Sequence, residues 1–393
     1  MPQQNRFQHQ PYGTECPSGN VELLCPAPPP PIGSDDYQRC LAGIGTTYRR
    51  ADVRAIYLLH GTFVGTDALG LIRGVARATP EVAESLYRLQ KQMLDALAGD
   101  AGNFTSAFAA EFERALNPAD TGSAPLPVRL FHWSSENHHV GRADGAVRLI
   151  DELASRPELS RGRVLVWGHS HGGNVLALMT NLLANDPATN RRFFEAAKSY
   201  YRWPWWGTID IQVWHRVRRM LEKDDHPLRH VALDLVTLGT PVRYGWDSGG
   251  LAHLLHFIYH RPAAGLPPYR APFPPPIPDV LAAAGGDYVQ QLGIAGTNTG
   301  HPFWAWRAWL ADIRLGRLLQ PGLRLRDTLA RLRLGVRAHH EGTTLLVDYG
   351  PARGHLGQHV AGHAVYTRLV WLPFHAAEIA RRFYCKLGSG LDF

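Results

Sequence analysis

The sequence has few cysteines, no long hydrophobic run and no signal-like leader. Four cysteines in 393 residues are too few for a disulfide scaffold and favour a reducing compartment. No uninterrupted apolar run approaches the roughly 18 residues that span a bilayer, so we expect a soluble protein. The first twenty residues contain no apolar segment typical of a secretory signal. We therefore expect a cytoplasmic chain, or one exported without a classical signal peptide.

Patterns for metal and nucleic-acid binding are also absent. The cysteine spacing matches no zinc pattern and no H-E-x-x-H motif occurs, so we expect no metal and no cofactor. Adjacent histidines such as His138 and His139 would point in opposite directions on a strand. The net charge is +7, and residues 313–337 are arginine-rich and amphipathic. No nucleic-acid motif accompanies these arginines, which favours a surface that faces solvent or a membrane.

What is present is a repeated alternation of apolar strand-like segments with amphipathic helical segments. The 45% hydrophobic content supports a large core. The alternation predicts an α/β fold, with a mostly parallel central sheet covered by helices on both faces. Active sites in such folds lie beyond the carboxyl ends of the strands. Strands are expected within residues 53–67, 126–135, 163–167, 230–245, 287–300 and 342–350, and helices near 81–98, 142–154, 175–183 and 374–385.

The length suggests one elaborated domain at residues 51–393, preceded by a proline-rich arm at 1–50 that lies outside the core. Two segments do not fit the alternation: an aromatic one at 186–230 and a proline-rich one at 246–286. We expect both to project over the strand ends as a cap or lid. The aromatic insertion would then offer a wall for an acyl chain and a peripheral membrane contact. Alternatively, its aromatic residues only pack a subdomain.

Residues 163–183, RVLVWGHSHGGNVLALMTNLL, place a serine between a strand and a helix. Gly168, Ser170 and Gly172 form G-x-S-x-G, in which small residues let strand and helix approach while the serine adopts a strained turn. This segment resembles the nucleophile elbow of α/β-hydrolases of lipase or esterase type. The resemblance covers roughly residues 52–385 and implies the α/β-hydrolase fold, with Ser170 as the nucleophile.

The same resemblance implies an oxyanion hole built from two backbone amides. One is the amide of His171, which follows the nucleophile. The other is the amide of Thr62, since His60-Gly61-Thr62 is similar to the H-G motif of lipases after an early strand. The imidazoles of His169 and His171 are expected to be turn neighbours that point away from the serine hydroxyl.

A serine hydroxyl needs a general base, which in this family comes after the last strand. Residues 355–379 offer His355, His359, His363 and His375. We select His363, because it is flanked by small residues and followed by Tyr366 in a manner that resembles lipases. His359 is the second candidate, and His375 is expected within the closing helix.

The acid that orients the base is less evident from the sequence. The loop expected to carry it reads GTNTG, with Asn298 where lipases show an aspartate. Asp348 ends the last expected strand, where a carboxylate in an apolar run is costly unless it is paired. We therefore predict Asp348 as the acid, within hydrogen-bond reach of His363. Asp247 is the second candidate and Asp287 the third.

The resemblance implies hydrolysis of carboxylic esters, with lipid-like acyl esters as the expected substrates, through an acyl-enzyme on Ser170. The expected partner is a small-molecule or lipid ester; no nucleic acid is expected, and the oligomeric state is open. One alternative is an acyltransferase on the same fold. Another is a non-catalytic interaction protein that keeps the fold. The segment FHWSSENHH, with Ser134, Glu136 and His138, either lines the site or packs a loop.

Overall fold

The described residues form a seven-stranded sheet in which every pair of neighbouring strands is parallel. The structure is a computed structural model that describes residues 7, 20–61, 104–119, 124–202, 211–294, 298, 305–321, 325–352 and 354–385. The strand order is β1-β7-β6-β5-β4-β2-β3. The strands are β1 Asn20–Leu24, β2 Val53–Leu59, β3 Val128–Phe131, β4 Gly162–His169, β5 Val231–Leu238, β6 His253–Tyr259 and β7 Thr343–Val347.

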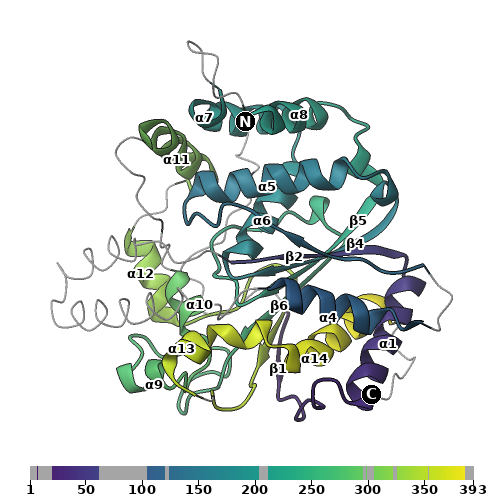
Figure 1. Ribbon diagram of the computed structural model, residues 1–393. Helices are drawn as coiled ribbons and strands as arrows, with labels where there is room; N and C mark the ends of the chain where they lie inside the picture. Colours follow the sequence, from purple (N-terminus) through teal and green to yellow (C-terminus); the bar gives the residue numbers. More distant parts are fainter. Residues whose placement is uncertain are drawn as a thin grey trace.

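Helices cover both faces of this sheet (Figure 1). α5 and α6 lie on one face, and α1, α4 and α14 lie on the other. No helix within the described residues combines the length and the hydrophobicity needed to cross a bilayer. The α-helices are α1 Asp35–Arg50, α4 Ser106–Leu116, α5 His139–Ala154, α6 His171–Ala184, α7 Pro187–Tyr201, α8 Gln212–Leu221, α9 Ile277–Leu281, α10 Tyr288–Gly293, α11 Trp306–Leu319, α12 Leu325–Leu334, α13 Leu356–His359 and α14 Leu372–Ile379.

The strands are apolar without alternation because both of their faces are buried. In β2, Tyr57 and Leu59 contribute to the core beneath α5 and α6, whereas Ile56 and Leu58 contribute to the core on the opposite face. Successive side chains of a strand point to opposite faces of its sheet, so a doubly covered strand needs apolar residues at every position. The predicted α/β architecture, a parallel sheet with helices on both faces, is therefore confirmed.

The aromatic segment 186–230 forms a layer outside α5 rather than a cap whose aromatic side chains face the strand ends. α7 begins where the Asp186 side chain accepts hydrogen bonds from the amides of residues 188 and 189, with a proline at the first helical position. α7 packs on α11, and α8 packs on α5. The described aromatic residues inside this layer are buried: Phe193, Phe194, Tyr201 and Trp214. They pack a subdomain, and residues 203–210 lie outside the described residues.

The N-terminal segment belongs to the core, so the prediction of a separate arm at residues 1–50 is wrong for its described part. β1 pairs in parallel with β7 at one edge of the sheet. α1 packs on α4 and α14, and Tyr48 donates its hydroxyl to the carbonyl of Ala376 at 2.9 Å. The polar and proline-rich composition of the segment concealed a short edge strand, since an edge strand is covered less than the central ones.

Two further predictions for the second half of the chain are wrong. Residues 253–259, placed in a proline-rich insertion at 246–286, form β6 between β5 and β7. Residues 287–300, predicted as a strand, begin with α10 instead. The sequence HLLHFIY is apolar except for two histidines. These histidines, and the prolines that follow, make the buried strand hard to recognise from the sequence. The expected helix near 81–98 lies outside the described residues.

Candidate active site

Ser170 occupies a sharp turn between β4 and α6. Its backbone has φ 52° and ψ −131°, a conformation that is rare for a residue with a side chain. Two hydrogen bonds to the end of β5 hold this turn: the Ser170 amide donates to the carbonyl of Leu238 at 2.9 Å, and the Thr240 hydroxyl donates to the carbonyl of Ser170 at 2.8 Å. The neighbouring strand therefore stabilises the strained conformation.

The glycines around Ser170 are required by close backbone packing. A Cβ atom on Gly168 would lie 2.7 Å from the backbone nitrogen of Gly173, and one on Gly172 would lie 2.8 Å from the carbonyl oxygen of His60. A Cβ atom on Gly173 would lie 2.1 Å from the Thr240 hydroxyl. Real Cβ atoms do not approach this closely, so small residues let helix and strand meet, as the motif predicts.

The loop that follows β2 passes directly beside Ser170. A Cβ atom on Gly61 would lie 2.7 Å from Cβ of Ser170 and 3.3 Å from its Oγ. His60 is buried at this point, and the indole of Trp133 donates to its carbonyl at 2.9 Å. Thr62, the predicted second oxyanion donor, lies outside the described residues. The amide of His171 is the first N–H of α6, which has no acceptor within its own helix.

His363 lies in an irregular, buried segment at Val360–Thr367, between β7 and α14. Val360, Ala361 and Gly362 adopt positive φ values of 48°, 51° and 91°, so the chain turns tightly just before the histidine. A Cβ atom on Gly362 would lie 2.3 Å from the carbonyl oxygen of Gly286. The turn that carries His363 is therefore packed against the residue that precedes Asp287.

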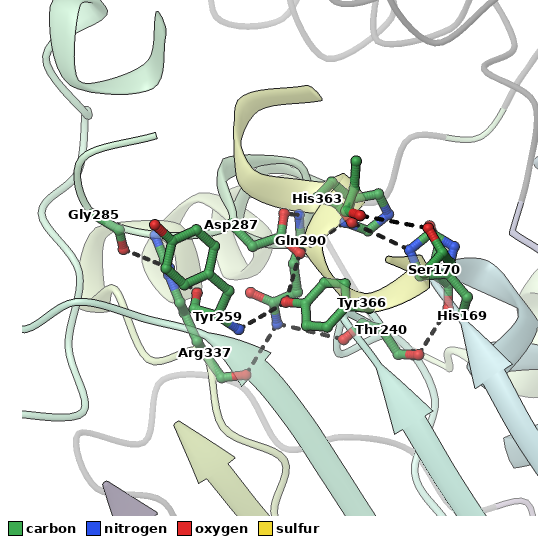
Figure 2. Close-up of polar contacts among 12 residues, drawn as sticks. His169, Ser170, Thr240, Tyr259, Gly285, Asp287, Gln290, Arg337, His363 and Tyr366 are labelled. Atoms are coloured by element: carbon green, nitrogen blue, oxygen red, sulfur yellow. Dashed lines mark hydrogen bonds and ion pairs between the residues drawn. The ribbon is translucent and has the colours of Figure 1, made fainter. Parts of the chain in front are cut away.

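The partner of His363 is Asp287. Nδ1 of His363 lies 2.7 Å from Oδ2 of Asp287, and the carboxylate is 0% exposed. Nε2 of His363 is buried and has no hydrogen-bond partner among the described residues. Figure 2 shows the imidazole between Asp287 and the turn that contains His169 and Ser170. Asp287, the third candidate from the sequence, thus takes the place expected of the acid.

The prediction that Asp348 contacts His363 is wrong. Asp348 follows β7, and its carboxylate pairs with Arg261, with 3.1 Å between Nε and Oδ1. It also accepts a hydrogen bond from the amide of Gly350 at 2.9 Å. These local partners thus offset the unfavourable free energy of placing a carboxylate beside an apolar strand. Asp247, the second candidate, caps a short turn by accepting from the amide of Gly249.

Asp287 follows β6, which is the penultimate strand along the chain. The family resemblance implies an acid in the loop after the penultimate strand. Without β6, the sequence alone places that loop at Asn298, where no aspartate occurs, and so predicts Asp348 instead. The signal that would have located the acid is the apolar run 253–259, whose length fits a buried strand. The missed strand therefore contributed to the wrong choice of Asp348 as the partner of His363.

Buried polar groups hold the Asp287 carboxylate in place (Figure 2). Oδ1 accepts from the amide of Gln290 at 2.9 Å, and Oδ2 accepts from the hydroxyl of Tyr366 at 2.9 Å as well as from His363. Burial, followed by the negative charge of Asp287, raises the pKa of Tyr366 well above its usual range, so the phenol remains a donor. The Tyr366 oxygen also accepts from the amide of Tyr259 at 2.7 Å, which links the acid to the end of β6.

Arg337 is a fully buried cation that joins both ends of the loop leading to Asp287. Its Nη1 donates to the carbonyls of Tyr259 and Gly285, at 3.0 Å each, and its Nη2 donates to Oε1 of Gln291 at 2.7 Å. The pKa of Arg337 is lowered by burial, and the nearby negative charge of Asp287 opposes part of this shift. Arg337 is thus a positioning residue for the acid.

Comparison with models of known protein families, with curated proteins and with solved structures finds no match for this chain. The chemical assignment therefore depends on the geometry of the site. The described residues also contain no group of three or more His, Cys, Asp or Glu side chains arranged to hold a metal ion.

The histidines next to Ser170 are buried and neutral. Nε2 of His169 lies 3.4 Å from the carbonyl oxygen of His363, and the two rings are 4.6 Å apart. Asn174 donates to Nδ1 of His171 at 3.1 Å. Burial lowers the pKa of both imidazoles well below 6.5. Neither histidine contacts an acid in the described structure, so of these three histidines only His363 has the partner that a general base requires.

The unexplained segment FHWSSENHH contributes to a buried hydrogen-bonded ring centred on Arg142. Arg142 is 0% exposed and donates to Tyr244 at 2.9 Å and to Oδ1 of Asn298 at 2.6 Å. His139 closes the ring, with Nδ1 2.7 Å from the Tyr244 hydroxyl and Nε2 3.1 Å from Nδ2 of Asn298. A third donation from Arg142 reaches Oδ1 of Asn137 at 2.7 Å. Asn298 is therefore a ring member and not a substitute for the acid.

Since a guanidinium can only donate, Arg142 determines the direction of every hydrogen bond in this ring. Asn298 must accept through Oδ1, so its amide group donates to Nε2 of His139. His139 is neutral, because burial lowers its pKa well below 6.5, and its proton therefore lies on Nδ1. Arg142 has no carboxylate partner among the described residues, and its charge contributes to the low pKa of His171. A positive charge is thus buried near the amino end of α6.

Proposed function

We propose that this protein is a serine hydrolase of the α/β-hydrolase fold that cleaves carboxylic esters through an acyl-enzyme on Ser170. The observation that carries the proposal is the pairing of His363 with Asp287 beside a strained serine turn. The parallel sheet with helices on both faces, the turn after β4 and the histidine after β7 agree with what the sequence resemblance implies. The pairing also gives the base an acid partner, which weakens the case for a non-catalytic interaction protein that keeps the fold.

In this proposal the tautomer of His363 determines the chemistry. The Asp287 carboxylate can only accept, so the proton of the neutral imidazole lies on Nδ1 and a lone pair remains on Nε2. That lone pair takes the Ser170 proton as Oγ attacks the ester carbonyl, and Nε2 then returns the proton to the leaving alcohol. Asp287 stabilises the imidazolium that forms. A water molecule then attacks the acyl-enzyme with the same proton transfers through Nε2, which releases the carboxylic acid product and restores the Ser170 hydroxyl.

The developing oxyanion would be stabilised by two backbone amides, one at the start of α6 and one in the segment that follows β2. The amide of His171 is the first donor, and that of Thr62 is the second in the proposal. Both donate to an oxygen that gains charge only in the transition state, where each such bond contributes about 3 kcal/mol. We propose a lipid-like acyl ester as the substrate class, as the resemblance to lipases and esterases implies.

The decisive experiment is labelling with a fluorophosphonate probe, which reacts only with an activated serine. We expect labelling of the wild-type chain at Ser170 and none in Ser170→Ala. Ser135→Ala is the matched control, because Ser135 is also buried, also has positive φ and contacts His60. This control should keep its label. Absence of labelling in the folded wild-type protein would overturn the proposal.

A second measurement separates the hydrolase from the acyltransferase. A short p-nitrophenyl ester is incubated with and without a large excess of an added alcohol, and the acyl products are identified. A hydrolase releases mainly the free acid under both conditions. Predominant transfer to the alcohol would assign the same acyl-enzyme to an acyltransferase.

A further inference from the structure

α11 exposes the two most exposed large apolar side chains of the described structure. Trp306 is 56% exposed and Trp309 is 54% exposed. Exposing this much indole surface to water is unfavourable, and paired exposed tryptophans mark an interaction surface more often than scattered aliphatic residues do. The two lie one helical turn apart, so their side chains share one face.

The outward face of α11 is amphipathic along its length. Ala311, Leu315 and Leu319 are buried on the inner side, where α11 contacts α5 and α7. On the opposite side, residues three or four apart form one stripe that is apolar at its start and cationic at its end. We call this stripe the outer face of α11; its residues are Trp306, Trp309, Leu310, Ile313, Arg314 and Arg317.

The charge of this region has one sign. Residues 305–334 contain seven arginines and two aspartates, so they carry five of the seven net positive charges of the chain. Arg314 and Arg317 are both exposed, and neither has a carboxylate within ion-pair distance among the described residues. Asp312 points inward and accepts from the amide of Val140 at 2.9 Å. The outer face therefore presents indoles and unpaired guanidiniums together.

α11 lies on the side of the molecule that contains the candidate active site (Figure 1). Asp312 caps the first turn of α5, which begins at the carboxyl ends of the strands, and α11 lies at that edge with α10 and α12 (Figure 1). Ser170 follows the carboxyl end of β4. A partner bound to α11 would thus be near the edge of the sheet at which Ser170 lies.

We propose that the outer face of α11 docks on the headgroup layer of an anionic phospholipid bilayer. Trp306 and Trp309 would enter the boundary between headgroups and acyl chains, where indole rings are favoured, while Arg314 and Arg317 bind lipid phosphates. The aliphatic Leu310 and Ile313 between them suit acyl chains better than the bases of a nucleic acid, which stack on aromatic rings. The proposal thereby assigns the membrane contact to α11 instead of residues 186–230, because the described aromatic side chains of that segment are buried or partly buried.

The test is co-flotation of the catalytically inactive Ser170→Ala chain with lipid vesicles, so that its result does not depend on the proposed chemistry. We expect binding to vesicles of phosphatidylglycerol and phosphatidylcholine in equal parts, and much weaker binding to phosphatidylcholine alone. Trp306→Ser with Trp309→Ser should weaken binding by about tenfold or more. Arg314→Gln with Arg317→Gln should weaken it by about fivefold for each arginine, and added salt should reduce that difference.

The matched control replaces Ile277 and Leu281, which are 41% and 39% exposed on α9, by serine. This variant should bind vesicles as the parent does. In the otherwise wild-type chain, the tryptophan variant should hydrolyse a soluble short-chain ester at the parental rate. Parental vesicle binding by the tryptophan variant would overturn the proposal, as would a concentration-dependent dimer that this variant abolishes, which would assign the face to a second copy of the chain.

Discussion

Replacing Asp287 by asparagine changes one atom at the centre of the candidate site. The remaining amide must satisfy the same partners, and the structure determines how it does so. Oδ1 of Asp287 accepts from the amide of Gln290, so the asparagine oxygen is expected at that position. Its amino group then occupies the position of Oδ2, where it faces Nδ1 of His363 and the hydroxyl of Tyr366.

A donor at this position selects the wrong tautomer of His363. The amino group needs a lone pair on Nδ1, so the imidazole proton moves to Nε2, which then cannot accept the proton of Ser170. Loss of the carboxylate also removes the charge that stabilises the imidazolium. Together these effects should lower kcat about ten-thousandfold with little change in KM, which corresponds to about 5 kcal/mol of transition-state stabilisation.

The assay is steady-state hydrolysis of a short p-nitrophenyl ester by Asp287→Asn and by Asp348→Asn. The Asp348 carboxylate is partly exposed and pairs with Arg261, so its replacement should change kcat by no more than about twofold. Because Asp287→Asn brings two donors together at Tyr366, it should also destabilise the fold by about 1–3 kcal/mol. Thermal unfolding therefore has to show that the variant is folded at the assay temperature. Activity within tenfold of wild type for a folded Asp287→Asn would refute the assignment, as would a large loss for Asp348→Asn.

Three further predictions follow from the same geometry. His363→Ala should lower kcat about a thousandfold or more, whereas His359→Ala, another buried histidine of the same segment, should remain active; the reverse pattern would mean that the base has been misassigned. Gly61→Ala places a methyl group 2.7 Å from Cβ of Ser170 and should lower kcat about a hundredfold, while unchanged kinetics would show that the loop yields freely. Burial lowers the pKa of His375 from 6.5 to about 3, so the unfolded chain takes up this proton first and the folded state loses stability as the pH falls from 6.5 towards 3. Denaturation at several pH values should show that the free energy of unfolding of His375→Leu depends less steeply on pH than that of the wild type, by up to about 1.4 kcal/mol per pH unit. Equal slopes for the two proteins would contradict the shift.

Local patterns in the sequence were sufficient for the elbow and for most of the sheet. The strand and helix around Ser170 have apolar residues at the spacing that each element requires. The glycines of the motif indicate where the backbones of strand and helix pack closely. His363 was selected from its small neighbours and its place after the last strand, and the structure places it beside an acid. The positions of the turn and of His363 could be predicted because each depends on residues that are near one another in the chain; their catalytic roles stay predictions.

The acid could be decided only by the tertiary structure. Asp287 and His363 are 76 residues apart, and a single sequence does not show which of several carboxylates crosses that separation. Asp348 is closer in the chain, but its side chain is held by Arg261 and by the turn at Gly350. β6 is missed for a different reason: both faces of the sheet are covered, which removes the alternation of a half-exposed strand, and two histidines interrupt its apolar run.

The solvent exposure of aromatic residues was likewise decided by packing and not by composition. Residues 186–230 and α11 are both rich in tryptophan and arginine, and the sequence favoured the first as the contact surface. The structure buries Trp214 against α5 and leaves Trp306 and Trp309 in solvent. Local sequence thus determines which helices are amphipathic, whereas the position of each helix in the fold determines which apolar side chains still face water.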